Sequence, residues 1–447
     1  MTAEPAPEVT RTALAASSGA SRAKVGAWAM WDWGTQPFQS VIVTFVFSVY
    51  ITSTAFGQTN ATSQALSLSS TIAGLIVAAI APVLGQNSDR TGRTVAHLRL
   101  LTWALAALSA ALFLVRPEPS YLWLGLGILA VGTIVAEIAN VNYYSLIEQV
   151  ASPANVGRVS GFGWGLGYLG GIVVLLALNF AFIAPQVGLF GVTGADGLDI
   201  RVSMLGCGLW IALFTIPTFL ALRDSPRPRV PRVGVRRSYG LLWQSVVRLY
   251  RTSPHTLAFL GASALFRDGL SGVFAFGAVI AAGTFGFSGS EIITFGAAAN
   301  VVAGLSTIAF GHLDDRIGPK RVILVSLVAL VLCGIGIFVL HDAGKTAFWV
   351  MGMIMTAFVG PAQSASRSFL ARLIPEGKAG EVFGLYATTG RVVSFLAPAA
   401  FGLSIALGAA VTGEANTQYW GILGIVVVLL AGLLVLIPVR EGAHRIT

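Results

Sequence analysis

Twelve apolar stretches, each about long enough to cross a lipid bilayer, follow one another along the 447-residue chain. Only 11% of the residues are charged, whereas a soluble chain of this length carries about 25%. The sequence therefore predicts an all-α polytopic membrane protein with twelve transmembrane helices, the first of them retained and not cleaved as a signal peptide. The predicted spans cover residues 27–51, 64–84, 95–115, 120–146, 158–183, 202–222, 255–283, 290–311, 321–340, 346–366, 381–408 and 417–438.

The distribution of basic residues predicts that both termini face the cytoplasm. Only Arg116, Arg201 and Lys345 fall in the connections that would then lie outside, although the chain has 28 Lys and Arg. The net charge of +9 is thus explained by membrane orientation, and no nucleic-acid partner is expected. We expect an integral protein of a bacterial cytoplasmic membrane.

Several protein classes are disfavoured by what the sequence lacks. It has no Gly-Lys-Ser/Thr loop for nucleotide phosphates and no nucleophile elbow, so neither an ATP-driven pump nor an enzyme is expected. Cys207 and Cys333 fall in separate spans with no metal-binding spacing. We therefore predict no cofactor and no metal site.

A basic connection at residues 223–252 divides the spans six and six. It contains eight Arg and one Asp, and its first half is rich in proline. Its second half, SYGLLWQSVVRLYRT, predicts an amphipathic helix on the anionic leaflet. The predicted parts are a disordered cytoplasmic tail (1–24), an N-terminal six-helix bundle (25–222), the linker (223–252), a C-terminal six-helix bundle (253–440) and a cytoplasmic tail (441–447).

The two halves repeat a loop motif. GQNSDRTGRT (85–94) follows the second span and GHLDDRIGPK (311–320) follows the eighth, and both fit G-x3-D-R-x-G. Glycine lets helices approach closely, and aspartate accepts hydrogen bonds from a helix N-terminus. We expect these loops to act as a conformational latch that forms in one facing of the protein and breaks in the other. The latch residues are Gly85, Asp89, Arg90, Gly92, Gly311, Asp315, Arg316 and Gly318.

Three longer stretches resemble one known family: WAMWDWGTQPFQSVIVTFVFSVY (28–50), NVNYYSLIEQVASPANVGRVSGFGWGLGYLGG (140–171) and SASRSFLARLIPEGKAGEVFGLYATTGRVVSFLAP (364–398). This is the "unknown major facilitator" family of the major facilitator superfamily, which includes autophagy-related vacuolar amino-acid effluxers of fungi. The resemblance implies two pseudo-symmetric six-helix bundles and secondary transport by alternating access around a central site. Amino-acid efflux is the leading activity that it implies. The chain departs from the family at Arg267, where an Asn is common.

Polar residues inside the spans are the candidates for binding and coupling, because a charge in hydrocarbon is costly and usually faces a partner or a water-filled cavity. In span one, Asp32, Gln36 and Gln39 share one helical face, and Pro37 between them predicts a kink. The substrate or coupling candidates are Asp32, Gln36, Gln39, Glu137, Asn140, Tyr144, Arg267, Asp268 and Arg391. The candidates for a gate are Glu148, Arg158 and Arg367.

The candidate charges have two interpretations. They can form interhelical salt bridges that orient helices and gate the path, or a desolvated carboxylate can load and release protons. An amino acid would use Arg267 or Arg391 for its carboxylate and an acidic residue for its ammonium. Other cargoes remain open, namely a sugar, a lysolipid or an amphipathic drug, as does a sensor that moves no solute. We expect a monomer whose partners are a small-molecule substrate, membrane lipids and, in the second interpretation of the charges, protons.

A stripe of small residues is predicted on span five. Gly163, Gly167 and Gly171 fall at four-residue steps, which favours close helix packing.

Overall fold

The structure is a computed structural model, and it describes residues 21–87, 94–150, 156–224, 234–373 and 379–440. Within these ranges it contains helices and turns and no strand. Each predicted span coincides with one helix or with two or three consecutive helical segments. In the first half these are α1 (Arg22–Pro37), η1 (Phe38–Phe45) and α2 (Phe47–Ile51), then α3 (Thr59–Asn87), α4 (Thr94–Ala111), α5 (Leu122–Ser145), α6 (Val156–Leu178) with η5 (Asn179–Ile183), and α7 (Leu198–Phe214) with α8 (Ile216–Ala221).

The linker contributes one helix, and the second half repeats the pattern of the first. The helices are α9 (Val235–Thr252), α10 (Pro254–Gly283), α11 (Gly289–Ile317), α12 (Pro319–Val339), α13 (Lys345–Leu373), α14 (Ala379–Val392) with α15 (Leu396–Thr412), and α16 (Gly421–Leu436). The eleventh span is therefore broken at residues 393–395.

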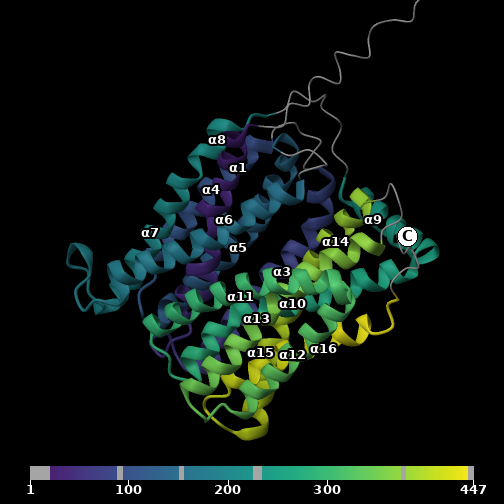
Figure 1. Cartoon of the computed structure of the whole chain (residues 1–447). Helices are drawn as coiled ribbons and strands as arrows, with labels where there is room; N and C mark the ends of the chain where they lie inside the picture. The colour runs from purple at the N-terminus through teal and green to yellow at the C-terminus, as the bar shows by residue number, and fades with distance from the viewer. Residues whose placement is uncertain (1–20, 88–93, 151–155, 225–233, 374–378, 441–447) are drawn as a thin grey trace, which may run out of the picture.

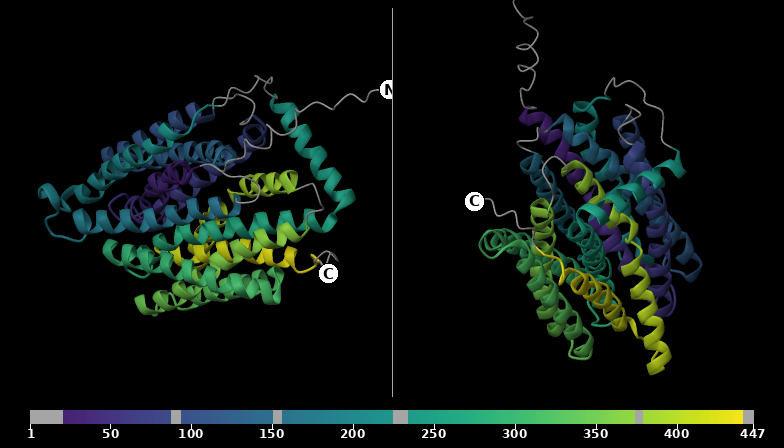
Figure 2. Two further views of the ribbon diagram at one scale, coloured as in Figure 1. Left: turned by 45° about the horizontal axis from the view of Figure 1, so that its top comes forward. Right: turned by 90° about the vertical axis from the view of Figure 1, so that its right-hand side faces the viewer.

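The two halves form two bundles that lie side by side (Figure 1). Between the bundles, α3 packs on α14 and α15, α6 packs on α11, and α10 packs on η1. These are corresponding positions of the two halves, as a repeat requires. We call the side where α1 begins and α9 lies the linker face, and the opposite side, where α3 begins, the far face (Figure 2).

Hydropathy identifies most of the predicted spans in the structure. Among the residues that the structure describes, nine helical stretches are long and apolar enough to cross a membrane. The three that fall short are the first crossing, α11 and α13. Each of these three contributes polar side chains to a cavity between the bundles, such as Gln36, Asn300 and Gln363.

The predicted kink at Pro37 is a change of helix type. Phe38–Phe45 is a π-helix, and the helical geometry is interrupted again at Val46, where φ is −117°. Proline has no backbone N–H and clashes with the preceding turn, so the regular hydrogen-bond ladder cannot continue through it. Insertions of π-helix are frequent at functional sites. Here Gln39, Ser40 and Thr44 of the π-helix line the cavity.

The glycine stripe on α6 packs against α1 and η1, and its four-residue spacing predicts such close packing. A Cβ added at Gly163 would lie 2.8 Å from Oδ2 of Asp32, and one added at Gly171 would lie 2.6 Å from Oγ of Ser40. Both positions therefore require glycine for the observed approach of the two helices.

The latch is only partly described. Asp89, Arg90 and Gly92 lie outside the described residues, Gly85 lies in α3, and Gly311 and Asp315 lie in α11. Arg316 is exposed in the last turn of α11. Gly318 ends that helix with a φ of +88°, a conformation that favours glycine. The latch role itself stays a prediction.

The first helix begins slightly earlier than predicted. Residues 22–24 belong to α1 and not to a disordered tail, because Ser21 caps the helix and accepts a hydrogen bond from the backbone N–H of Lys24 at 3.3 Å. The remainder of the predicted tails, residues 1–20 and 441–447, lies outside the described residues.

Candidate substrate-binding cavity

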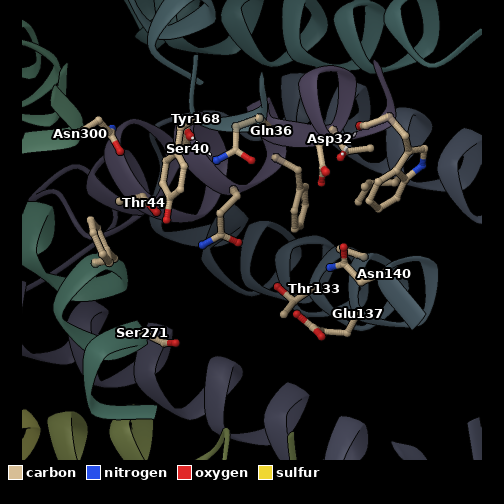
Figure 3. Close-up of a pocket in the computed structure, with 18 of the residues that line it drawn as sticks. Asp32, Gln36, Ser40, Thr44, Thr133, Glu137, Asn140, Tyr168, Ser271 and Asn300 are labelled. Atoms are coloured by element: carbon tan, nitrogen blue, oxygen red, sulfur yellow. Dashed lines mark hydrogen bonds between the residues drawn. The ribbon is translucent and has the colours of Figure 1, made fainter. Parts of the chain in front are cut away.

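A cavity of about 360 Å³ lies between the two bundles (Figure 3). Ligand-binding cavities in proteins commonly measure about 300–1,000 Å³, so it can hold a small organic molecule. The first half contributes α1, η1, α4, α5 and α6, and the second half contributes α10, α11 and α13. The polar lining residues are Asp32, Thr35, Gln36, Gln39, Ser40, Thr44, Thr133, Glu137, Asn140, Tyr144, Tyr168, Ser271, Asn300 and Gln363.

Six of the nine predicted substrate or coupling candidates line this cavity. They lie on the first and fourth predicted spans. Figure 3 shows Asp32 and Gln36 on one wall and Glu137 and Asn140 on the facing wall. The six residues are Asp32, Gln36, Gln39, Glu137, Asn140 and Tyr144.

The carboxylate of Asp32 is held by a tyrosine that sequence reasoning did not single out. The hydroxyl of Tyr143 donates a hydrogen bond to Oδ2 of Asp32 at 2.8 Å. The Tyr143 ring stacks on Trp28 at 4.6 Å and on Trp31 at 4.3 Å between centroids. The indole N–H of Trp31 donates in turn to Thr102 at 2.9 Å. Trp28 and Trp31 of α1 therefore build a rigid aromatic support beside the Asp32 carboxylate.

An ion pair joins the two bundles at the cavity. Nε of Arg391, in the last turn of α14, lies 3.5 Å from Oε2 of Glu137 on α5. The side chain of Glu137 is 40% exposed and that of Arg391 20%. Arg391 is not itself a lining residue, but its partner is, so the guanidinium lies at the edge of the cavity.

Arg267 and Asp268 are not among the lining residues of the cavity, and their substrate or coupling roles stay predictions. The guanidinium of Arg267 stacks on the ring of Tyr386 at 4.1 Å and donates to the Tyr386 carbonyl at 3.0 Å. Oδ2 of Asp268 accepts a hydrogen bond from the backbone N–H of Ala397 at 2.6 Å, at the start of α15. Neighbouring residues on a helix point about 100° apart, and at this rotation of α10 both side chains face α14 and α15.

Several lining residues lie outside the nine predicted candidates, and only some of them carry a sequence signal. Asn300 and Gln363 are amides within apolar spans, where polar groups mark candidate sites. Thr133 carries no such signal, because a threonine in a helix can bond to its own backbone, and its hydroxyl donates to Leu129 O at 2.9 Å. Ser40 and Thr44 also carry hydroxyl groups, and for the same reason their residue types give no sequence signal for a site.

The gate candidates stay predictions. Glu148 lies in the short helix Leu146–Gln149 and Arg158 lies in α6, but their side chains are outside what is described. Arg367 is exposed on α13.

The charge of the cavity is asymmetric. Two carboxylates line it, those of Asp32 and Glu137, and no Lys or Arg is among the described lining residues. Such a lining favours a solute with a cationic group. The described part of the chain holds no cluster of three or more His, Cys, Asp or Glu that could bind a metal ion.

A second, apolar pocket of about 40 Å³ adjoins the cavity on the side of the C-terminal bundle. Phe45 and Phe274 line both spaces. Apart from Thr356, the remaining wall of the small pocket is apolar and includes Phe295, Phe348 and Met355. A ligand that fills both spaces would place its polar part against α1 and α5 and its apolar part against the C-terminal bundle.

Buried hydrogen bonds join the bundles on the far face. The amide of Asn60 donates to Oγ1 of Thr417 at 3.0 Å and accepts from the Thr417 backbone N–H at 2.8 Å. Gln418 donates to Ser63, and Ser67 donates to the carbonyl of Pro398, both at 2.5 Å. We call these contacts the far-face clasp. They connect α3 to α15 and to the segment that leads into α16, and so join the two bundles on the far face.

Comparison with known proteins agrees with this architecture. The family described as "Vacuole effluxer Atg22 like" matches residues 49–446. The uncharacterized MFS-type transporter YxiO of Bacillus subtilis (strain 168) is 26% identical over 426 residues, 93% of this chain and 94% of that protein. Autophagy-related protein 22-1 of Neosartorya fischeri is 26% identical over 269 residues, which are 55% of this chain and 43% of the fungal protein. The chain thus spans less than half the length of this fungal relative.

Solved structures share the fold. The inward open xylose transporter XylE from E. coli superposes with a TM-score of 0.63 at 14% identity, covering 95% of this chain and 96% of that one. A bacterial homologue of the iron transporter ferroportin, in an inward-facing state, gives a TM-score of 0.62 at 15% identity. The superposition covers 93% of this chain and 98% of that one. The chain therefore has the major facilitator fold in a membrane-spanning protein, and its relatives and neighbours are transporters and not enzymes.

Proposed function

Because the chain belongs to the family of Atg22-like vacuole effluxers, we propose that it moves a small amino acid or related organic solute across a bacterial cytoplasmic membrane by alternating access. The observation that carries this proposal is the cavity between the two bundles, where Asp32 and Glu137 face a common space. Transporters of this architecture bind their substrate near the middle of the membrane, between the two halves.

The cavity chemistry supports an amino acid as the cargo. The substrate ammonium would lie against Asp32, which Tyr143 holds in place. The substrate carboxylate would reach Arg391, whose guanidinium can bind a carboxylate through two parallel hydrogen bonds. To do so it would replace Glu137 as the partner of Arg391. A small aliphatic side chain would enter the apolar pocket beside Phe45 and Phe274.

The far-face clasp supports an inward-facing state. With the linker face in the cytoplasm, as the basic loops predict, the clasp closes the outer side of the cavity. Efflux would then begin with binding from the cytoplasm, followed by breakage of the clasp and closure on the linker face. The Glu137–Arg391 pair between α5 and α14 is placed to respond to this exchange.

Proton coupling is part of the proposal and rests on the buried carboxylate. Acidic residues within membranes commonly serve as proton relays, and Asp32 is such a residue with a hydroxyl donor beside it. Transport by wild-type protein should then depend on pH. A pH-independent rate in the wild type would remove the coupling and leave the carrier function standing.

A polyhydroxylated solute is the second candidate. Amide side chains both donate and accept hydrogen bonds, as sugar hydroxyls do, and the cavity is rich in them. This favours a sugar over a lysolipid or amphipathic drug, for which a mostly apolar cavity is expected. The amides are those of Gln36, Gln39, Asn140, Asn300 and Gln363.

Counterflow in liposomes tests the proposal. Purified protein is reconstituted, and uptake of labelled leucine, tyrosine and arginine is measured against the same unlabelled acids. We expect counterflow in the wild type and its loss in Asp32→Asn. The matched control Asp342→Asn should retain wild-type counterflow, since Asp342 is 92% exposed on the far face. Folded protein that exchanges xylose but no amino acid would overturn the amino-acid assignment. Protein that exchanges neither would overturn both candidates.

A further inference from the structure

The surface of α9 is divided into three stripes along the helix. Buried Ser238 and Leu249 face the rest of the protein. The aromatic residues Tyr239, Trp243 and Tyr250 are 41%, 68% and 70% exposed, and at 100° per residue they fall within about 40° of one another. They form an exposed aromatic stripe of the kind that lies at the boundary between membrane and water.

A basic stripe runs beside the aromatic one. Arg237, Arg248 and Arg251 are exposed and fall within about 60° of one another on the helix. The described residues of α9 include no acidic side chain. The helix therefore carries positive charge and aromatic rings on adjoining exposed stripes. Its third stripe, which includes Ser238 and Leu249, packs against the rest of the protein.

A shallow groove of about 390 Å³ lies where the two exposed stripes meet. Its walls are Trp243, Gln244, Val247, Arg248, Arg251 and Thr252. Arg248 and Arg251 are three residues apart, so both guanidinium groups lie on one side of the groove, with the indole on the other. Two guanidinium groups suit the oxygens of a phosphate, and the indole and Val247 suit the first methylenes of an acyl chain.

We propose that this groove binds the headgroup of an anionic phospholipid from the membrane leaflet at the linker face. Arg248 and Arg251 hold the phosphate, and Trp243 packs on the glycerol and upper acyl region. Charge complementarity selects this occupant, because polybasic segments next to a membrane attract anionic lipids. A zwitterionic headgroup would present a choline to the same two arginines.

The position of α9 ties this lipid site to both bundles. The hydroxyl of Tyr239 donates to the carbonyl of Ala79 on α3 at 2.5 Å. At its other end α9 is separated from α10 only by Ser253. A lipid bound in the groove therefore anchors a helix that contacts α3 of the N-terminal bundle and leads directly into α10 of the C-terminal bundle.

Fluorescence quenching by brominated lipids tests the site without measuring transport, so its outcome is independent of the proposed function. The full chain is reconstituted in vesicles that contain brominated phosphatidylglycerol or brominated phosphatidylcholine. The quenching due to Trp243 is the difference between the wild type and Trp243→Phe. We expect this difference to appear at a lower fraction of phosphatidylglycerol than of phosphatidylcholine.

The variant Arg248→Gln/Arg251→Gln should need about 10- to 30-fold more phosphatidylglycerol for the same Trp243 quenching, since each arginine near a membrane surface changes the affinity for anionic lipid about fivefold. The matched control Arg22→Gln/Arg321→Gln removes two exposed charges at the linker face and should behave as wild type. Equal quenching by the two lipids, or an equal loss in the control, would overturn the proposal. Size-exclusion chromatography verifies that each variant is folded.

Discussion

The hydroxyl of Tyr143 lies 2.8 Å from the carboxylate of Asp32, and two indoles hold the tyrosine ring in place. The acid that the proposed function assigns to substrate or proton binding therefore has a fixed orientation in the cavity. A carboxylate that is held in this way needs no reorganisation when a cationic group arrives, which favours binding.

Removal of the Tyr143 hydroxyl should impair transport more than folding. In Tyr143→Phe the ring stack remains, but a hydrogen bond to a charged group is lost, which is worth about 1.5–3 kcal/mol. We expect counterflow to fall at least about tenfold. Tyr143→Ala also removes the ring and should lower the melting temperature well below that of Tyr143→Phe, because deleting a buried aromatic side chain costs about 3–5 kcal/mol. Wild-type counterflow in Tyr143→Phe would show that Asp32 acts without this hydrogen bond.

Gly163 should be far less tolerant of substitution than its neighbour Gly165. A Cβ at Gly163 would lie 2.8 Å from both Asp32 Oδ2 and Trp28 Cζ3, whereas nothing lies within 4 Å of a Cβ at Gly165. Overpacking costs about 1–3 kcal/mol. Gly163→Ala should therefore lower both the melting temperature and counterflow, and Gly165→Ala should change neither. Equal melting temperatures for the two variants would mean that α1 and α6 do not pack as closely as the structure shows.

The fold follows from the sequence more completely than the site does. Every backbone group in hydrocarbon must be paired within its segment, so apolar runs of this length fix the number and order of helices. The repeated G-x3-D-R-x-G loops fix the division into halves. Asp32 on the first span and Glu137 on the fourth could be predicted to face the cavity, because a charged side chain within a membrane usually faces a partner or a water-filled space.

The sequence does not determine how far each helix is rotated about its own axis. On α10, Arg267 and Asp268 turn toward α14 and α15, while Ser271, one turn later, lines the cavity. The break between α14 and α15 favours this rotation of α10, because it frees the backbone N–H of Ala397 to donate a hydrogen bond to Asp268. Hydropathy predicts one continuous span there and gives no sign of the break.

Asp268 should behave as a helix cap and not as a coupling residue. Its carboxylate accepts the hydrogen bond of Ala397, and an asparagine oxygen can accept the same bond. Asp268→Asn should therefore retain most of the counterflow, whereas Asp32→Asn should lose it. Asp268→Leu removes the acceptor and should destabilise the protein by about 0.5–2 kcal/mol, measured by thermal unfolding in detergent. Complete loss of transport in a stable Asp268→Asn would restore the coupling role that the sequence suggested.

Separate variants of Glu137 and Arg391 should affect transport far more than stability. Partly exposed ion pairs contribute only about 0–1 kcal/mol, so Glu137→Gln and Arg391→Gln should unfold close to the wild-type temperature. The proposed substrate contact predicts that Arg391→Gln loses counterflow, whereas Glu137→Gln should lose it only if the ion pair itself acts as a gate. In the exchanged variant Glu137→Arg/Arg391→Glu the pair is restored but the charges have changed places. Counterflow that recovers in this variant would identify the pair as a gate only, and continued loss would support Arg391 as the substrate anchor.

The far-face clasp should set the balance between inward- and outward-facing states. Asn60→Ala removes two inter-bundle hydrogen bonds to Thr417, worth together about 1–3 kcal/mol, or roughly a 5- to 150-fold shift of the equilibrium. Spin labels at Gln58 and Ala415, both exposed on the far face, report this change by electron–electron distance measurement once the buried Cys207 and Cys333 are replaced by alanine. We expect the distance distribution of Asn60→Ala to gain a component at longer distance that is only weakly populated in the wild type. Thr54→Ala, an exposed position near the start of α3, is the matched control and should leave the distribution unchanged. If Asn60→Ala leaves it unchanged as well, the clasp does not hold the outer side closed, and the lost hydrogen bonds are replaced by water at no cost to the inward-facing state.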